Sequence, residues 1–164
     1  LESILVGELI PEVGINFGFA LPAAKNTSEI CALEARIIKT SGGVQSTGGL
    51  AFGASSHVAR IILSAMQTDL RYRSALNIRY TKELIEAAES AGLTLGTFQR
   101  AEEPEGESTM EWGTRTAIEQ LGFVPDLIYD EGGAGKEPMV RVLAQTPQEA
   151  VEKVSKLKEA LGLK

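Results

Sequence analysis

Hydrophobic positions recur along the chain with two different periods, and blocks of the two kinds alternate. Short apolar or β-branched runs are typical of strands, and we expect strands at 13–21, 31–40, 74–80, 93–99, 126–130 and 139–144. Apolar residues three and four positions apart predict helices from Ser55 or Ser56 to about Asp69, at 82–92, at 108–122, and from 146 onward. The alternation predicts one layered α/β domain over residues 1–164, a sheet flanked by helices.

Polar residues at two of the helix starts support these boundaries. Ser108 and Glu111 have the spacing of a capping box, and Thr146 with Glu149 forms a second strong start. The glycine-rich stretch 48–53 is expected to be a loop before the first long helix.

That first helix is apolar around most of its circumference. His57, Arg60, Ser64 and Gln67 fall on the one narrow polar stripe that remains. A mostly buried helix with a single polar stripe usually turns that stripe toward a cleft, so we expect a cleft here.

Two strands carry charged or amide side chains among apolar neighbours. Arg36 lies in the strand expected at 31–40, where an unpaired buried charge is costly and calls for a partner or a ligand. Asn77 and Arg79 share one face of the strand expected at 74–80, because side chains alternate along a strand.

The segment from Gly53 to Arg60 has the features of an anion-binding helix start. Gly53 permits close approach of the backbone, Ser55 and Ser56 offer donors, and the first helical turn presents unpaired N–H groups. His57 lies in that turn and can donate to a phosphoryl oxygen or supply a proton. The alternative is a capped core helix whose histidine is hydrogen-bonded to backbone.

A second glycine-rich segment, 131–136, does not have the spacing of a nucleotide-binding P-loop, and Glu137 stands where Ser or Thr is required. Lys136 can still reach a phosphate, and Asp130 or Glu131 can hold a hard divalent cation. A polar surface turn is the alternative. The acidic stretch 100–107 reads as a surface loop, either without a role or acting as a lid.

Composition narrows the classes of function. With 43% hydrophobic and 23% charged residues the chain is globular, and no apolar run is long enough to span a membrane. A net charge of −6 argues against direct nucleic-acid binding, and no secretory signal is visible, which favours the cytoplasm. One histidine and one cysteine, Cys31, exclude a zinc site built by this chain, so no protein metal site is expected; Cys31 is expected in the core.

Several segments, taken together and in order, resemble the ThiN family of thiamine-phosphate synthases. The matching segments are Glu8–Gly14, Ala20–Pro22, Phe52–Arg60, Asn77–Tyr80, Glu111–Gly113 and Tyr129–Pro138. The resemblance implies a fold like that of class II aldolases such as fuculose-phosphate aldolase. It also implies a transferase that joins hydroxymethylpyrimidine diphosphate to hydroxyethylthiazole phosphate, giving thiamine phosphate and pyrophosphate.

The resemblance also implies partners and a rival function. Members of the family are often the C-terminal part of a fusion with a hydroxymethylpyrimidine phosphate kinase, which fits a chain that begins at Leu1. Related domains serve as noncatalytic sensors of thiamine phosphates in transcriptional regulators, so sensing is the alternative. The sequence is compatible with a homodimer.

Specific residues follow from the resemblance. Arg36 and His57 match the family's essential arginine and histidine and are expected to be catalytic. Substrate phosphates are expected to contact Gly53, Ser55, Ser56, Arg60, Asn77, Arg79 and Lys136. Mg²⁺ is expected to assist the departing pyrophosphate, held more by substrate oxygens than by protein ligands.

Overall fold

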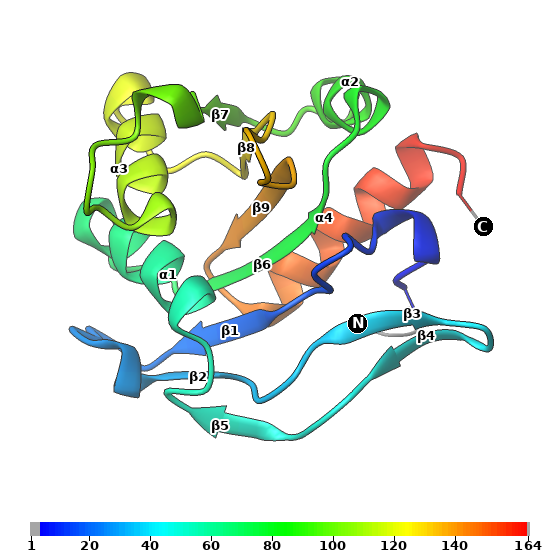
Figure 1. Ribbon diagram of the computed structural model, residues 1–164, viewed down its shortest axis with the longest axis horizontal. Helices are drawn as coiled ribbons and strands as arrows, with labels where there is room; N and C mark the ends of the chain where they lie inside the picture. Colours follow the sequence, from blue (N-terminus) through cyan, green and yellow to red (C-terminus); the bar gives the residue numbers. More distant parts are fainter. Residues whose placement is uncertain (1–3, 164) are drawn as a thin grey trace.

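A seven-stranded mixed sheet lies at the centre of the computed structural model, which describes residues 4–163 (Figure 1). The strand order is β5-β2-β1-β6-β9-β8-β7, and neighbours are antiparallel except for the parallel pair β7 and β8. The strands are β1 (Phe17–Ala20), β2 (Ile30–Leu33), β5 (Leu50–Phe52), β6 (Ser74–Arg79), β7 (Leu95–Thr97), β8 (Leu127–Asp130) and β9 (Met139–Ala144).

Four α-helices cover the two faces of this sheet (Figure 1). One face packs against α1 (Ser56–Thr68) and α3 (Thr109–Leu121), and the other against α2 (Lys82–Ser90) and α4 (Pro147–Ala160). Short 3₁₀ turns occur at η1 (Gly7–Leu9), η2 (Thr27–Glu29) and η3 (Arg100–Glu102). The predicted layered α/β arrangement is confirmed.

A separate hairpin of β3 (Ile37–Thr40) and β4 (Gly43–Ser46) adjoins the sheet through a bridge between Ile15 and Ile37. The single strand expected at 31–40 is therefore wrong. The chain leaves β2 after Leu33 and enters the hairpin at Ile37, so Arg36 lies in the connection between two sheets. The alternation of Leu33, Ala35 and Ile37 with charged residues conceals this bend, because Ile37 is again buried.

Three other local predictions need correction. The first strand covers only Phe17–Ala20, and the expected loop at 48–53 contains β5, which pairs with β2. Ser108 is the N-cap of α3, but its side chain makes no capping hydrogen bond, so the capping box is wrong. Thr146 does cap α4 by accepting a hydrogen bond from the backbone N–H of Glu149.

The pleat of β6 and β9 separates two kinds of side chain. Toward α2 and α4 the two strands present Leu76, Ile78, Val140 and Val142, all of which are fully buried. Toward α1 and α3 they present small and apolar residues first, and then Asn77 of β6 directly opposite Arg141 of β9. The first turns of α1 and α3 and the loop after β8 lie close to this polar pair.

Helix α3 packs unusually close to the sheet. The ring of Phe98 lies beneath Gly113, and a β-carbon at that glycine would overlap the ring atoms. The same ring meets Trp112 edge-on, with 5.6 Å between the ring centroids. The contact fixes the depth of α3 and with it the position of its first turn.

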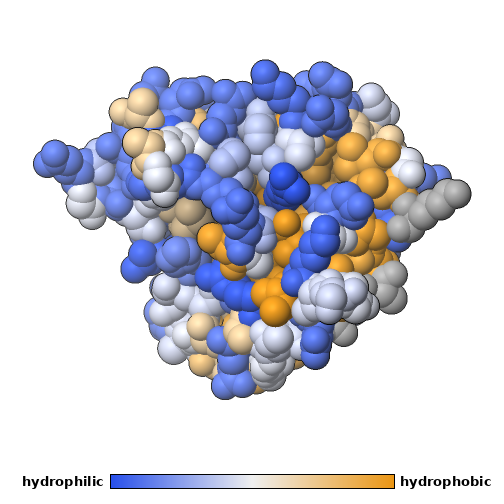
Figure 2. All heavy atoms as spheres, turned by 45° about the vertical axis from the view of Figure 1, so that its right-hand side comes forward, coloured by the Kyte–Doolittle hydropathy of each residue, from blue (hydrophilic) through white to orange (hydrophobic). Residues whose placement is uncertain are grey.

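The surface has mixed polarity where Figure 2 shows it, with a band of hydrophobic side chains between hydrophilic ones. Within residues 4–163, none of the helices has both the length and the apolar character needed to cross a bilayer. Cys31 in β2 is only half-buried, so the expectation of a core cysteine holds in part.

Candidate functional site

A cavity of about 410 Å³ opens between the first turns of α1 and α3, the last part of β6, the start of β9, and the loops beside them. Its walls combine apolar, polar and cationic side chains. The lining residues are Val13, Asn16, Arg36, His57, Val58, Ile61, Asn77, Arg100, Ser108, Thr109, Met110, Gly135, Lys136, Glu137, Met139 and Arg141.

A smaller hollow of about 230 Å³ shares Asn16, Arg36 and His57 with this cavity. It extends to Ser55 and Ser56 at the start of α1. Ser55 is the N-cap residue of α1, and its hydroxyl makes no capping hydrogen bond. The first turn of α1 therefore faces a hollow with unpaired donor capacity, as the anion-binding prediction requires.

Arg36 and His57 come from distant segments and meet at this junction. Within residues 4–163 the half-buried guanidinium of Arg36 has no ion-pair partner. Burial lowers the pKa of His57 below its ordinary value, and the positive charges of Arg36 and Arg60 lower this pKa further. The imidazole is consequently neutral at neutral pH while it stands beside an unpaired cation.

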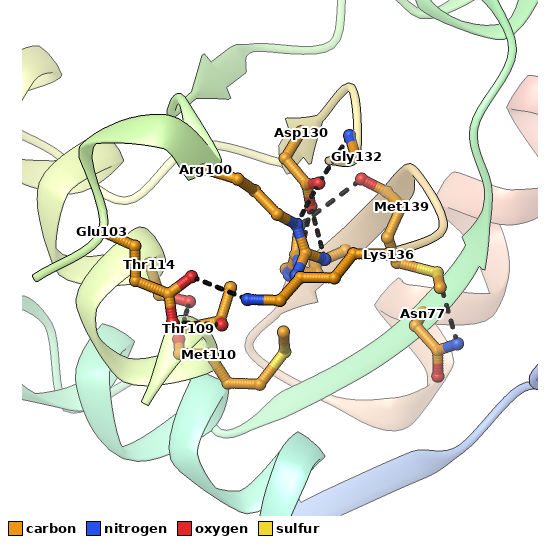
Figure 3. A network of polar contacts seen from close by, with 11 residues as sticks. Asn77, Arg100, Glu103, Thr109, Met110, Thr114, Asp130, Gly132, Lys136 and Met139 are labelled. Carbon is orange, nitrogen blue, oxygen red and sulfur yellow. Dashed lines mark hydrogen bonds and ion pairs between the residues drawn. The ribbon is translucent and has the colours of Figure 1, made fainter. Parts of the chain in front are cut away.

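A buried ion-pair cluster forms another wall, and the sequence reasoning missed it. Asp130 is fully buried and pairs with two arginines: Arg100 Nε lies 2.5 Å from Oδ1, and Arg141 Nη2 lies 2.8 Å from Oδ2 (Figure 3). Gly132 N–H also donates to Oδ1, at 2.9 Å. The available signal was an arginine in the middle of the apolar run Met139–Ala144, the same feature that singled out Arg36.

Two loops meet above this cluster. Lys136 Nζ lies 3.3 Å from Oε2 of Glu103, whose other oxygen accepts a hydrogen bond from the hydroxyl of Thr109 at 2.5 Å (Figure 3). Glu137 accepts hydrogen bonds from the backbone N–H groups of residues 12 and 13, at 2.8 and 3.4 Å. These contacts join the loop after β8 to the stretch at 100–107 and to the chain before β1.

The structure brings together only some of the predicted site residues. Arg36, His57, Asn77 and Lys136 line the main cavity, and Ser55 and Ser56 line the hollow beside it. The side chain of Asn77 is engaged in positioning, since its Oδ1 accepts from Asn16 N at 2.8 Å and its Nδ2 donates to Gly14 O at 2.9 Å.

Three predicted residues lie elsewhere. Arg79 faces a separate hollow beside Lys39, and Arg60 faces a third hollow beside Arg115. Gly53 has a positive φ of 74° in the turn between β5 and α1 and lines none of these hollows. The expected polar stripe of α1 is thus divided, and Ser64 within it is buried and donates to the carbonyl of Arg60.

Protein metal ligands do not cluster in the described chain: residues 4–163 contain no group of three or more His, Cys, Asp or Glu side chains able to hold an ion. Glu34 is the acidic side chain of the hollow beside Arg36 and His57. A single carboxylate suits a divalent cation that takes its other ligands from phosphate oxygens and water.

The fold and the cavity define a class, an α/β domain with aldolase-like architecture and a cationic pocket. The L-fuculose-1-phosphate aldolase from Thermus thermophilus shares the fold, with a TM-score of 0.51 at 9% identity over 93% of this chain and 80% of that one. Residues 1–156 match the family described as thiamine-phosphate synthase ThiN, and the chain belongs to this family. The predicted resemblance is confirmed, and with it a place in thiamine biosynthesis.

Relatives agree with this membership. The chain is 48% identical to the bifunctional thiamine biosynthesis protein ThiDN of Methanocaldococcus jannaschii over 89% of its length, but spans only 35% of that protein. It is 32% identical to the thiamine-phosphate synthase ThiN of Methanothermobacter thermautotrophicus, over 92% of this chain and 82% of that one. The crystallised C-terminal domain of a phosphomethylpyrimidine kinase superposes with a TM-score of 0.88 at 41% identity, covering 95% of this chain and 91% of that one.

Proposed function

We propose that this domain is a thiamine-phosphate synthase, which joins hydroxymethylpyrimidine diphosphate to hydroxyethylthiazole phosphate and releases pyrophosphate. The observation that carries the proposal is the convergence of Arg36 and His57 on one cavity that adjoins the start of α1. The family and the M. thermautotrophicus relative, both thiamine-phosphate synthases by name, supply the reaction class.

The proposed reaction requires stabilisation of the negative charge on the leaving group. The lone pair of the thiazole nitrogen forms a bond to the methylene carbon of the pyrimidine, and the bond from that carbon to the diphosphate oxygen breaks. The bonding pair leaves with pyrophosphate, and the thiazole nitrogen becomes a cation. Negative charge therefore grows on the departing oxygen, and fixed cations or N–H donors aimed at it lower the barrier.

The residues around the smaller hollow suit this demand. Arg36 has no competing ion-pair partner in the described chain, so it can pair with diphosphate oxygens, and the start of α1 with Ser55 and Ser56 adds N–H and hydroxyl donors. The neutral imidazole of His57 donates one N–H to the same group. Bound oxyanions raise the pKa of His57, so that it takes up a proton and can pass it to pyrophosphate.

Glu34 and substrate oxygens would hold Mg²⁺ in this hollow. When bound, the ion supplies charge neutralisation to the pyrophosphate.

We further propose that the domain acts within a longer polypeptide whose kinase part supplies the diphosphate. The M. jannaschii relative, which is named as bifunctional, and the crystallised domain, which is the C-terminal part of a phosphomethylpyrimidine kinase, support this proposal.

The test is to mix the purified domain with both substrates and Mg²⁺ and to measure thiamine phosphate by chromatography. Arg36→Ala and His57→Ala should each reduce kcat/KM by roughly 10²- to 10⁴-fold without lowering the melting temperature, because neither side chain supports the core. Arg71→Ala is the matched control, since that arginine is exposed and pairs with Asp69, away from the cavity.

Normal turnover in both cavity variants would refute the assignment. Binding of thiamine phosphate by the wild-type domain without any synthesis would point instead to a noncatalytic sensor.

A further inference from the structure

Arg141 is a buried cation whose hydrogen-bonding capacity is largely unused. Its side chain is 1% exposed, yet among the described residues its Nε and Nη2 atoms find no hydrogen bond of acceptable geometry, and Nη1 makes only a long contact of 3.4 Å to the carbonyl of Met139. A guanidinium carries five N–H donors, and leaving them idle in the interior is costly. Such a cost is expected where a ligand completes the bonds.

Asp130 cannot supply the missing acceptors. Its Oδ1 already accepts from Arg100 Nε and from the N–H of Gly132, and Oδ2 is shared between Arg100 and Arg141. The carboxylate does hold Arg141 in place, as does the ring of Phe98, whose centroid lies 5.0 Å from Cζ of the guanidinium. Arg141 is thus anchored on one side and lines the cavity on the other.

The cations of this wall outnumber the carboxylates that pair with them. Within residues 4–163, Arg100, Arg141 and Lys136 pair with only two carboxylates, those of Asp130 and Glu103. All three cations line the cavity, whereas Asp130 and Glu103 do not, and the one carboxylate of this wall that does, Glu137, is held by the backbone N–H groups of residues 12 and 13. Arginine forks match the tetrahedral oxygens of a phosphate group, so a phosphate monoester is the ligand that this wall fits.

This wall is separate from the Arg36 and His57 junction. Arg36 follows β2, whereas Arg141 lies in β9. These two strands are three positions apart in the sheet, so their backbones are separated by roughly 14 Å at the usual spacing between neighbouring strands. Apolar side chains of Val58, Ile61 and Met110 line the cavity as well and offer a surface for flat rings. Two substrates that each carry a phosphate group repel one another unless each group has its own cations.

We infer that Arg141, Arg100 and Lys136 form a second phosphate subsite, which binds the phosphate of the thiazole substrate while the start of α1 binds the diphosphate of the pyrimidine. The assignment rests on the proposed function. With the two phosphate sites at different ends of the cavity, the thiazole ring can approach the methylene carbon opposite the leaving group, as an in-line displacement requires.

The experiment compares calorimetric binding of hydroxyethylthiazole phosphate with that of unphosphorylated hydroxyethylthiazole. The wild-type domain should prefer the phosphorylated form, and Arg141→Gln should reduce this preference by about 10- to 100-fold. Affinity for inorganic pyrophosphate should stay within about 2-fold of the wild-type value, because its cations are at the other end. Arg71→Ala again serves as the control.

A second variant guards against misfolding of the first. Arg100→Gln keeps the pair between Asp130 and Arg141, and its side chain is 11% exposed, so the same loss of phosphate preference is expected in a folded protein. Loss of pyrophosphate affinity with an unchanged thiazole preference would overturn the subsite, as would no change in either. Absence of synthesis by the wild-type domain would overturn the proposed function alone, if the preference still depends on Arg141.

Discussion

The two faces of the sheet differ sharply along the same two strands. Toward α2 and α4, β6 and β9 present buried side chains that are almost all apolar, whereas toward α1 and α3 they carry the facing polar pair Asn77 and Arg141, close to the buried carboxylate of Asp130. Because neighbouring residues of a strand point to opposite faces, each strand serves both purposes at once. The comparison teaches that these two strands keep one face nearly apolar for the cohesion of the domain and place their buried charge on the other, beside the cavity.

The strongest challenge to this comparison is Asp130→Ala, which leaves two guanidinium groups without their shared carboxylate. We expect a loss of about 3–5 kcal/mol in unfolding free energy, together with loss of synthase activity. Denaturant titration measures the first and product formation the second. Glu107→Ala breaks the exposed pair with Arg115 and should cost at most about 1 kcal/mol. Equal losses of unfolding free energy in the two variants would show that the buried cluster stabilises the fold no more than an exposed ion pair does.

Leu157→Ala probes the opposite face. Leu157 of α4 is fully buried, and its truncation should lower the unfolding free energy by about 2–5 kcal/mol by leaving a cavity. The kcat and KM of the molecules that remain folded should not change, because no part of α4 lines the binding cavity. A shift in KM for either substrate would break the proposed division between the faces.

The smallest expected effect concerns the protonation of His57. Its pKa is lowered in the folded domain, so its contribution to stability is complete above the ordinary value of 6.5 and is lost as the pH falls through the lowered pKa. Wild-type protein should therefore lose more stability than His57→Gln between about pH 7 and pH 5. Bound pyrophosphate should raise the pKa of His57 again, so the wild-type domain should take up a proton when it binds pyrophosphate.

Calorimetry in buffers of different ionisation enthalpy measures that uptake. His57→Gln corrects for the titration of pyrophosphate itself. Identical proton uptake in the two proteins would remove His57 from the diphosphate site.

The pattern of apolar residues predicted helices and strands well where glycine or proline residues separate one element from the next. It failed at 34–36, because the residues on both sides of the bend are buried, in different layers. It also failed at β5, a short edge strand whose Leu50 and Phe52 are exposed, so no alternation marks it.

The sequence predicted only those site residues that stand out from their neighbours along the chain. His57 and Arg36 stood out as polar residues in apolar segments, and Arg141 met the same criterion without being recognised. Arg100 and Asp130 carry no such signal, since their pairing depends on β7 lying parallel beside β8. Arg79 was grouped with Asn77 by the strand period, but it lies at the last position of β6, where the chain around Lys39 provides a different hollow.

The contact between Gly113 and Phe98 bears on substrate selection. The first turn of helix α3 carries Thr109 and Met110 into the cavity wall. An added methyl group at position 113 has no room above the aromatic ring, so either the helix or the ring must shift. The position of this part of the cavity wall therefore depends on the absence of a side chain at position 113.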